Sequence, residues 1–362
     1  MALRVIQWAT GSVGKAAIDC IVKHPELELA GCWVHSNDKD GKDVGEIIGS
    51  DPIGVAATSS VDDILALEAD AVVYAPLIPN PDEVAALLRS GKNVVSPVGW
   101  FYPSDRESAP LVQACEAGRT TLHGTGMNPG GITETFPLML SAMSSAVTFV
   151  RAEEFSDIRT YGATDVVRWI MCFGGTREEA ERGPMLKLLT GGFTQSMQMV
   201  LDTLGLAGRA EIRTLHGVAV ATAPIASPIG TIEPGKVAGQ RFHWEAVVDD
   251  EVVVRIGVHW LMGEENLDPA WTFGERGERF EMEVRGNPDT FALIKGWQPD
   301  SIEEGLASNP GIVGTAAHCV NSVPYVVAAK PGIVTSLELP LIAGRAHPKL
   351  LGTGVASRQR SK

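Results

Sequence analysis

The turn after the first apolar run limits the possible folds of this chain more than any other feature of its sequence. Residues 3–8 predict a strand and residues 13–23 predict a helix, joined by Ala9-Thr10-Gly11-Ser12-Val13-Gly14. This is the pattern G-x-G-x-x-G with alanine in the first glycine position. Gly11 lets the backbone approach a diphosphate, Gly14 allows close packing of helix on strand, and free N–H groups at the helix start attract anions.

The glycine turn therefore predicts a binding site for a dinucleotide. The alternative is a turn that is rich in glycine for steric reasons alone. The cofactor-binding residues expected here are Thr10, Gly11, Ser12, Val13 and Gly14.

Short β-branched runs and helical stretches alternate through the first third of the chain. Such a rhythm predicts a parallel sheet with helices on both faces. The apolar doublets Val72-Val73 and Val94-Val95 fit strands that are covered on both sides. We expect residues 1–130 to form a Rossmann-type α/β dinucleotide-binding domain. The other strands and helical stretches expected in this domain lie at 27–34, 64–67, 71–75, 81–90, 93–96 and 120–123.

From Val150 onward the runs are longer and alternate strictly between apolar and polar residues. Residues 242–248 and 252–260 flank Asp249-Asp250-Glu251, which predicts an antiparallel hairpin. We expect an α+β second domain with an antiparallel sheet at residues 131–307, which binds substrate and dimerises. Residues 308–345, with a helix at 311–329, are expected to pack back on the first domain. The other strands of the second domain are expected at 213–222 and 280–285, and its helices at 177–189 and 194–204.

The residues after the second strand indicate which nicotinamide nucleotide is bound. An NAD-specific protein places an acid there for the adenosine ribose, whereas this chain has His35-Ser36-Asn37-Asp38-Lys39. Neutral groups followed by a lysine can hold a 2′-phosphate, so we predict NADP, with NAD also possible, bound by His35, Ser36 and Lys39. The alternative is a solvated turn.

Two further pairs of residues follow strands at the carboxyl edge of the predicted sheet, where ligands of open α/β sheets lie. Ala75 and Pro76 end one strand, and Ser96 and Pro97 end the next. We expect them to run along the nicotinamide ribose.

Composition and charge exclude several classes of function. The net charge is −14 and the Lys and Arg residues are scattered, so nucleic acid is not an expected partner. No apolar run approaches the roughly 20 residues that cross a bilayer, so no membrane association is expected. The five cysteines form no CxxC pair, which favours a reduced, cytoplasmic protein. We expect a small-molecule substrate, and a frayed segment in the last dozen residues.

Several blocks of the sequence resemble one known family over nearly the whole chain. They are the N-terminal glycine turn, residues 91–96, residues 124–130, and residues 321–324 with Pro331-Gly332. The chain resembles oxidoreductases with a dihydrodipicolinate-reductase-like N-terminal domain, near 2,4-diaminopentanoate dehydrogenase and the native amine dehydrogenases. The resemblance implies NAD(P)-dependent hydride transfer in a cleft between domains, and a homodimer built through the second domain.

The same resemblance implies that Asn128 and Asn321 lie near the nicotinamide. Asn128 precedes Pro129 and must be extended, so a purely structural turn is the alternative role.

The chain departs from that family at two places. It has no His-His pair of the kind that dihydrodipicolinate reductases use, which disfavours lysine biosynthesis. Amine dehydrogenases of this branch place a glutamate just after the strand that ends at Ser96. Here residues 97–103 contain no carboxylate, and the next is Asp105, which argues against reductive amination with free ammonia.

Hydride transfer to a carbonyl or imine also needs a proton donor and a pocket that excludes water. The candidate donors are Tyr102, His123, Glu154 and Tyr161. Glu154 follows Glu153 near the end of a strand, where the alternative is an inert surface pair. Trp100 and Phe101 could line an apolar substrate pocket, with Trp169, Met171 and Phe173 as a second wall, or these aromatic residues could pack in the core.

The sequence leaves three functions open. The first is an NAD(P)H-dependent oxidoreductase acting on a carbonyl or imine/amine carbon of a hydrophobic small molecule. The second is an amine dehydrogenase with a relocated carboxylate such as Glu154. The third is a non-catalytic NADP-binding sensor.

Overall fold

The computed structural model describes residues 2–351, in two compact units. The first unit comprises the residues up to Gly126 and those from Thr315 onward, and the second unit comprises Met127–Gly314. The segment expected to fray at the C-terminus lies outside the described residues. No helix within residues 2–351 is long and apolar enough to cross a membrane.

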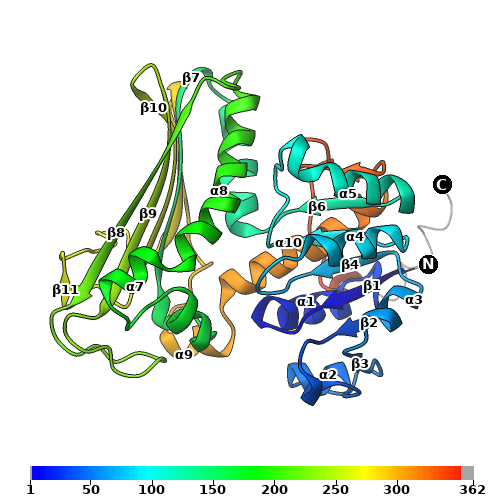
Figure 1. The fold of residues 1–362 in the computed structure, drawn as a ribbon. Helices are drawn as coiled ribbons and strands as arrows, with labels where there is room; N and C mark the ends of the chain where they lie inside the picture. Colours follow the sequence, from blue (N-terminus) through cyan, green and yellow to red (C-terminus); the bar gives the residue numbers. More distant parts are fainter. Residues whose placement is uncertain (1, 352–362) are drawn as a thin grey trace. The chain divides into compact units, whose positions relative to one another are not determined.

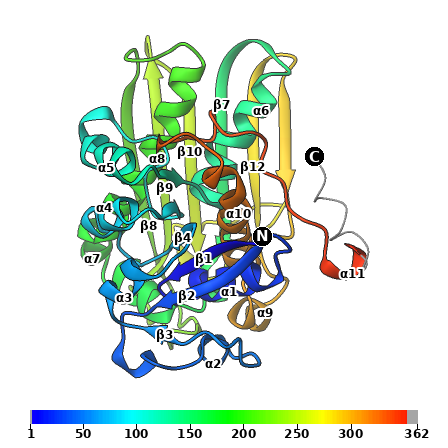
Figure 2. The same ribbon diagram turned by 90° about the vertical axis from the view of Figure 1, so that its right-hand side faces the viewer.

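The described residues of the first unit form a seven-stranded parallel sheet of order β14-β6-β5-β4-β1-β2-β3. Helices α1 and α10 cover one face and α4 and α5 cover the other (Figure 2). The expected Rossmann-type sheet is confirmed. Its strands are β1 (Leu3–Trp8), β2 (Leu27–Trp33), β3 (Ala57–Thr58), β4 (Ala71–Tyr74), β5 (Asn93–Ser96), β6 (Thr121–Gly124) and β14 (Gly332–Ile333). Its helices are α1 (Ser12–Lys23), η1 (Asn37–Lys39), α2 (Val44–Ile48), α3 (Val61–Ala66), α4 (Pro81–Arg89), α5 (Asp105–Gly118), α11 (Pro348–Leu351) and most of α10 (Pro310–Val327).

The core of the first unit explains why these strands are so apolar. Val72 and Val73 of β4 and Val94 and Val95 of β5 are fully buried, as expected for strands with helices on both faces. Each buried valine adds about 1.5–3 kcal/mol relative to an exposed one.

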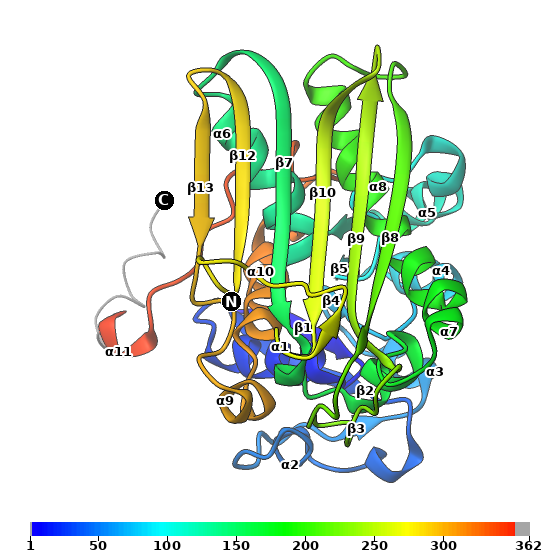
Figure 3. The ribbon, with the colours of Figure 1, turned by 90° about the vertical axis from the view of Figure 1, so that its left-hand side faces the viewer.

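The second unit is built on a seven-stranded sheet, among its described residues, of order β11-β8-β9-β10-β7-β12-β13. Most neighbours are antiparallel as expected, but β7 and β10 run parallel. Helices α6 and α8 lie behind the sheet in Figure 3, and the opposite face of the same sheet is turned toward the viewer. The strands are β7 (Ser145–Asp157), β8 (Glu211–Ala221), β9 (Val237–Val248), β10 (Glu251–Leu261), β11 (Leu267–Asp268), β12 (Arg279–Asn287) and β13 (Thr290–Ile294). The helical segments are η2 (Met127–Thr135), α6 (Phe136–Ser141), η3 (Ile158–Thr160), η4 (Val166–Ile170), α7 (Arg177–Arg182), α8 (Pro184–Thr203) and α9 (Ile302–Ala307).

The expected hairpin between β9 and β10 is confirmed. Asp249 and Asp250 both have positive φ, of 49° and 67°, which a two-residue type I′ turn requires. The strands then pair from Val248 opposite Glu251 onward.

The helices at 177–204 differ from the expectation, which was two helices separated by a break between Leu189 and Thr194. The break lies instead at Gly183, between α7 and α8, and α8 continues through Gly191 (Figure 1). Pro184 disfavours helical backbone at the residue before it and is itself well placed as the first residue of a helix.

Two faces of the second sheet carry different side chains. On β7, β9 and β10 the even-numbered residues face α8, and Phe242, Trp244 and Ile256 join its core. The odd-numbered residues face the other side. Glu154 and Glu153 therefore lie on opposite faces of one strand.

The glycine turn gives a test of the packing in the first unit. A Cβ on Gly14 would lie 2.2 Å from the carbonyl oxygen of Ala9, so Gly14→Ala must displace the turn or the start of α1. We expect a loss of about 1–3 kcal/mol in the free energy of unfolding, measured by urea denaturation.

Gly11→Ala is the matched control, because a Cβ there would meet nothing within 4 Å. Its expected loss is below about 1 kcal/mol. Equal losses for the two variants would contradict the close approach at Gly14.

Candidate functional site

The first unit presents an uncapped helix start at the glycine turn. The N-cap residue of α1 is Gly11, with extended backbone, and no side chain caps this end of the helix. The first turn of α1 also lacks acidic residues. Its backbone N–H groups and the positive end of the helix dipole therefore suit an anion. Thr10, Gly11, Ser12, Val13 and Gly14 are gathered at this point, as the sequence predicts.

The loop after β2 lies against the glycine turn. Lys39 Nζ donates a hydrogen bond to Thr10 Oγ1 at 3.1 Å, which ties the two segments together. Ser36 is hydrogen-bonded to Asp38 and lowers the pKa of that carboxyl, so Asp38 is ionised. The ring of His35 lies 6.0 Å from that of Trp33, at the end of β2.

The residues that follow β4 and β5 lie at the carboxyl edge of the sheet. The backbone N–H of Ala75, which Pro76 follows, bonds to the carbonyl of Trp8 at the end of β1. The hydroxyl of Ser96, which Pro97 follows, accepts a hydrogen bond from the N–H of Val98.

Two residues that were expected at the functional site have surroundings that do not suit the expected roles. His123 is fully buried, its Nδ1 lies 2.8 Å from the carbonyl oxygen of Val334, and burial lowers its pKa to about 4. It is therefore a neutral core imidazole at neutral pH rather than a proton donor. Asn321 lines a cavity of about 270 Å³ with Cys20 and His24 at the C-terminal end of α1, away from the glycine turn. Its expected role near the nicotinamide is not supported.

The aromatic candidates belong mainly to the cores. Met171 and Phe173 are buried in the core of the second unit, so they form no pocket wall, whereas Trp169 is exposed. Phe101 is buried, and Trp100 packs against Tyr74 with ring centroids 6.2 Å apart. Tyr102 is half-buried in the first unit.

The second unit assembles a group around the carboxyl of Glu154. Asn128 Nδ2 donates to Glu154 Oε2 at 2.6 Å, and Trp260 Nε1 donates to Glu154 Oε1 at 2.8 Å. Burial raises the pKa of Glu154, although these two hydrogen bonds favour the ionised form. Burial and the neighbouring charge of Glu154 also raise the pKa of Tyr161. We call Asn128, Glu154, Tyr161 and Trp260 the Glu154 cluster.

Strand geometry explains how the cluster forms. Glu154 on β7 is paired with Val258 on the parallel strand β10. Trp260, two residues further along β10, points to the same face and reaches the carboxyl. No local pattern in the sequence predicts this contact, because it depends on the pairing of two strands about a hundred residues apart.

Asn128 has one polar atom that the cluster does not satisfy. Its backbone is extended, as expected before Pro129, and its Nδ2 is bonded to Glu154. Its Oδ1 is buried and has no hydrogen-bond partner among the described residues. Buried polar atoms are normally paired, so this oxygen is a candidate acceptor for a ligand N–H group.

Glu134 is a buried acid that the sequence analysis missed. Its carboxylate accepts hydrogen bonds from the backbone N–H of Gly130 and from the hydroxyl of Thr133. The hydroxyls of Thr133 and of Ser196 on α8 lie 3.2 Å apart, with Ser196 as the donor, and this contact anchors the segment that carries Asn128. Burial raises the pKa of Glu134 to about 7.

Comparisons with known proteins match both units. The family model for the N-terminus of dihydrodipicolinate reductase matches residues 5–95, and that for the 2,4-diaminopentanoate dehydrogenase C-terminal domain matches residues 132–348. An amine dehydrogenase of Streptomyces virginiae is 29% identical over 94% of this chain and 96% of its own. The 2,4-diaminopentanoate dehydrogenase of Acetoanaerobium sticklandii is 22% identical over 94% of each chain.

A solved structure shows the same fold. The amine dehydrogenase from Mycobacterium smegmatis superposes with a TM-score of 0.77 and 21% identity, over 95% of this chain and 98% of that chain. The resemblance inferred from the sequence is confirmed.

The buried carboxyl of Glu134 makes a prediction about stability and pH. Its pKa is about 7 in the folded protein and about 4.5 when unfolded, so the folded state binds the proton more tightly. Its contribution to stability therefore falls as the pH rises from about 4.5 through about 7. Glu134→Gln should remove this fall, which is on the order of 3 kcal/mol.

The measurement is the free energy of unfolding of both proteins from pH 5 to 8. Parallel curves for the wild type and Glu134→Gln would show that Glu134 does not titrate in this range.

Proposed function

Because this chain belongs to the family defined by the 2,4-diaminopentanoate dehydrogenase C-terminal domain, we propose that Glu154 is the acid–base group of its reaction. The chain is an NAD(P)-dependent oxidoreductase that acts on an amine or imine carbon. A non-catalytic sensor is not favoured. We also propose that the chain uses NADP and that its substrates are hydrophobic small molecules.

The residues of the first unit fit a nicotinamide dinucleotide. The uncapped start of α1, the space beside Gly11 and the ammonium of Lys39 are all suited to phosphate groups. The bound nicotinamide would supply or accept the hydride. This chain would hold the diphosphate of the cofactor at the glycine turn. It would hold the nicotinamide ribose at Ala75, Pro76, Ser96 and Pro97.

The Glu154 cluster suits a nitrogen-centred substrate. An ammonium or iminium group carries only N–H donors, and Glu154 and Asn128 Oδ1 offer acceptors in a half-buried setting. In the oxidative direction Glu154 takes a proton from the substrate ammonium, because hydride can leave only from the carbon of the neutral amine. In the reductive direction it returns that proton.

The raised pKa of Glu154 supports this role. A catalytic acid–base group works best when its pKa lies near the working pH. Burial moves the pKa of Glu154 toward neutrality, while Trp260 and Asn128 orient both carboxyl oxygens. Glu154 would thereby replace the glutamate that residues 97–103 lack. Tyr161 and Tyr102 remain candidates for a supporting role in proton transfer.

We further propose that the protein is a homodimer and that it lies in a reducing, cytoplasmic compartment. A homodimer through the second unit is supported by apolar side chains exposed on the odd-numbered face of its sheet, namely Leu215, Phe291 and Leu293. A reducing, cytoplasmic location is supported by the five cysteines, which all lie within the described residues and are free.

The role of Glu154 is tested by ammonia-dependent oxidation of NADPH with a panel of hydrophobic ketones and aldehydes. The wild type should require ammonia, and Glu154→Gln should lower kcat by about 10²–10⁴-fold without changing NADPH affinity. Glu211→Gln is the control, because Glu211 is an exposed carboxylate of the same sheet that pairs with Arg213, and it should retain activity. Oxidation of NADPH without ammonia would instead favour carbonyl reduction, and equal activity of Glu154→Gln and the wild type would exclude the proposed role.

The preference for NADP is tested at the loop after β2. Lys39→Ala removes a charge-assisted contact to the 2′-phosphate, so its affinity for NADPH should fall at least about tenfold while that for NADH changes less. Calorimetry with both nucleotides measures the difference. Lys42→Ala is the control, because Lys42 lies in the same loop but pairs with Glu46. A similar loss for NADH and NADPH would contradict a 2′-phosphate contact.

A further inference from the structure

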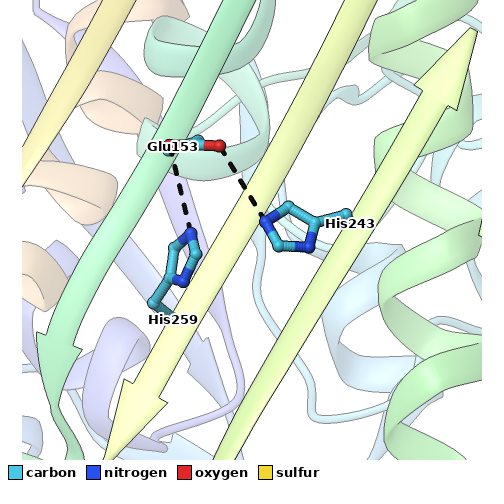
Figure 4. A group of neighbouring side chains, drawn as sticks. All are labelled: Glu153, His243 and His259. Carbon is cyan, nitrogen blue, oxygen red and sulfur yellow. Dashed lines mark ion pairs between the residues drawn. The ribbon is translucent and has the colours of Figure 1, made fainter. Parts of the chain in front are cut away.

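We propose that Glu153, His243 and His259 bind a divalent transition-metal ion of the zinc type on the odd-numbered face of the second unit's sheet. The three side chains come from three adjacent strands, β7, β9 and β10 (Figure 4). This site lies on the opposite face from Glu154. The proposal is therefore independent of the proposed reaction.

The three side chains converge on one point. Glu153 Oε1 lies 3.9 Å from His243 Nε2, and Glu153 Oε2 lies 4.0 Å from His259 Nε2. The three candidate ligand atoms all lie within 4.8 Å of one another. An ion bound about 2.0–2.1 Å from each atom in a tetrahedral site needs separations of about 3.4 Å. Glu153 Oε1 and His243 Nε2 must therefore approach by about half an ångström, and the most distant of the three ligand atoms by up to about 1.4 Å.

A glycine provides the space for this convergence. Gly257 on the central strand β10 is paired with both Glu153 and His243. A Cβ at this position would lie 2.8 Å from Glu153 Cγ and 3.1 Å from His243 Cδ2. Any other residue at position 257 would separate the carboxylate from the imidazole, whereas glycine leaves the gap open.

His259 points to a missing ligand. Its side chain is 9% exposed, and neither Nδ1 nor Nε2 has a hydrogen-bond partner among the described residues. The ring stacks on Phe155, with centroids 4.2 Å apart and planes at 1°, which fixes its orientation. A buried imidazole without partners is rare, because each unpaired polar atom costs about 1–3 kcal/mol. A metal ion on Nε2 would satisfy one of the two.

The donor set matches transition-metal chemistry. Two imidazoles and one carboxylate are the ligands of many catalytic zinc and non-haem iron sites, and they leave a coordination position open. Imidazole binds metal in its neutral form, and burial lowers the pKa of both His243 and His259.

Most of the arginines around the site are paired with glutamates. Arg151 bonds to Glu153 and also to Glu281 and Glu283. Two further pairs balance charge nearby, Arg279 with Glu281 and Arg255 with Glu245, and the guanidinium of Arg241 lies over Trp271. Arg276 also pairs with Glu281 and Arg285 with Glu283, so six arginines face four glutamates. Arg151 contacts only Oε2 of Glu153, which leaves Oε1 for an ion.

A bound ion would link three strands, including the parallel pair β7 and β10.

The full-length protein, stripped with chelator and dialysed, should bind one Co²⁺ per chain with visible d–d absorption, and Zn²⁺ should displace it. Zn²⁺ should also raise the thermal midpoint. His243→Gln and His259→Gln should each weaken Co²⁺ binding at least about tenfold.

His216→Gln is the matched control, because His216 lies on the same sheet and stacks on Phe242 with centroids 4.3 Å apart. It should bind Co²⁺ as the wild type does. The proposal is wrong if the wild type binds no stoichiometric Co²⁺, or if His243→Gln retains full affinity. His243 is the more exposed of the two histidines, so His243→Gln decides the outcome if His259→Gln fails to fold.

Discussion

The alternation of side chains along β7 places two successive carboxylates in opposite surroundings. Glu154 points to the face that carries α8, where Trp260 and Asn128 donate to it. Glu153 points to the other face, between Arg151 and two histidines. A shift of one residue in the pairing of β7 would exchange these positions. The register of β7 with β10 and β12 thus fixes both the candidate acid–base group and the candidate metal site.

The segment before β7 supports the Glu154 cluster through a buried acid, Glu134. Glu134 holds the backbone of Gly130, and Thr133 reaches Ser196 on α8. This arrangement keeps Asn128 extended and its amide nitrogen directed at Glu154. A polar network inside a core is costly unless its members are satisfied, and here most of the hydrogen bonds are made. The orphan Oδ1 of Asn128 is the exception.

The sequence predicts features that depend on neighbouring residues better than those that depend on distant pairing. The glycine turn, the apolar doublets of β4 and β5 and the β9–β10 hairpin follow from local chemistry, and all were found. The parallel pairing of β7 with β10 could not be predicted, because alternation gives a strand its faces but not its partners. The break at Gly183 was missed because a helical pattern continues on both sides of Pro184.

The same limit applies to the candidate site. Glu154 was a candidate from the sequence and Asn128 was implied by the resemblance, but Trp260 and Glu134 were not expected, because their roles come from tertiary contacts. Asn321 was expected from the resemblance, yet α10 carries it to the far end of α1.

The unpaired oxygen Oδ1 of Asn128 favours a catalytic role over a purely structural role for the Glu154 cluster. A cluster kept only for stability would be better served by apolar side chains of similar volume, since buried charges stabilise weakly. Here the fold keeps a carboxyl with a raised pKa, directs two donors at it, and leaves an acceptor beside it unpaired. A ligand that brings several N–H groups would pair that acceptor and share the carboxylate, and an ammonium or iminium group does both. The unsatisfied atom therefore favours a nitrogen substrate over a carbonyl, whose oxygen offers no donor.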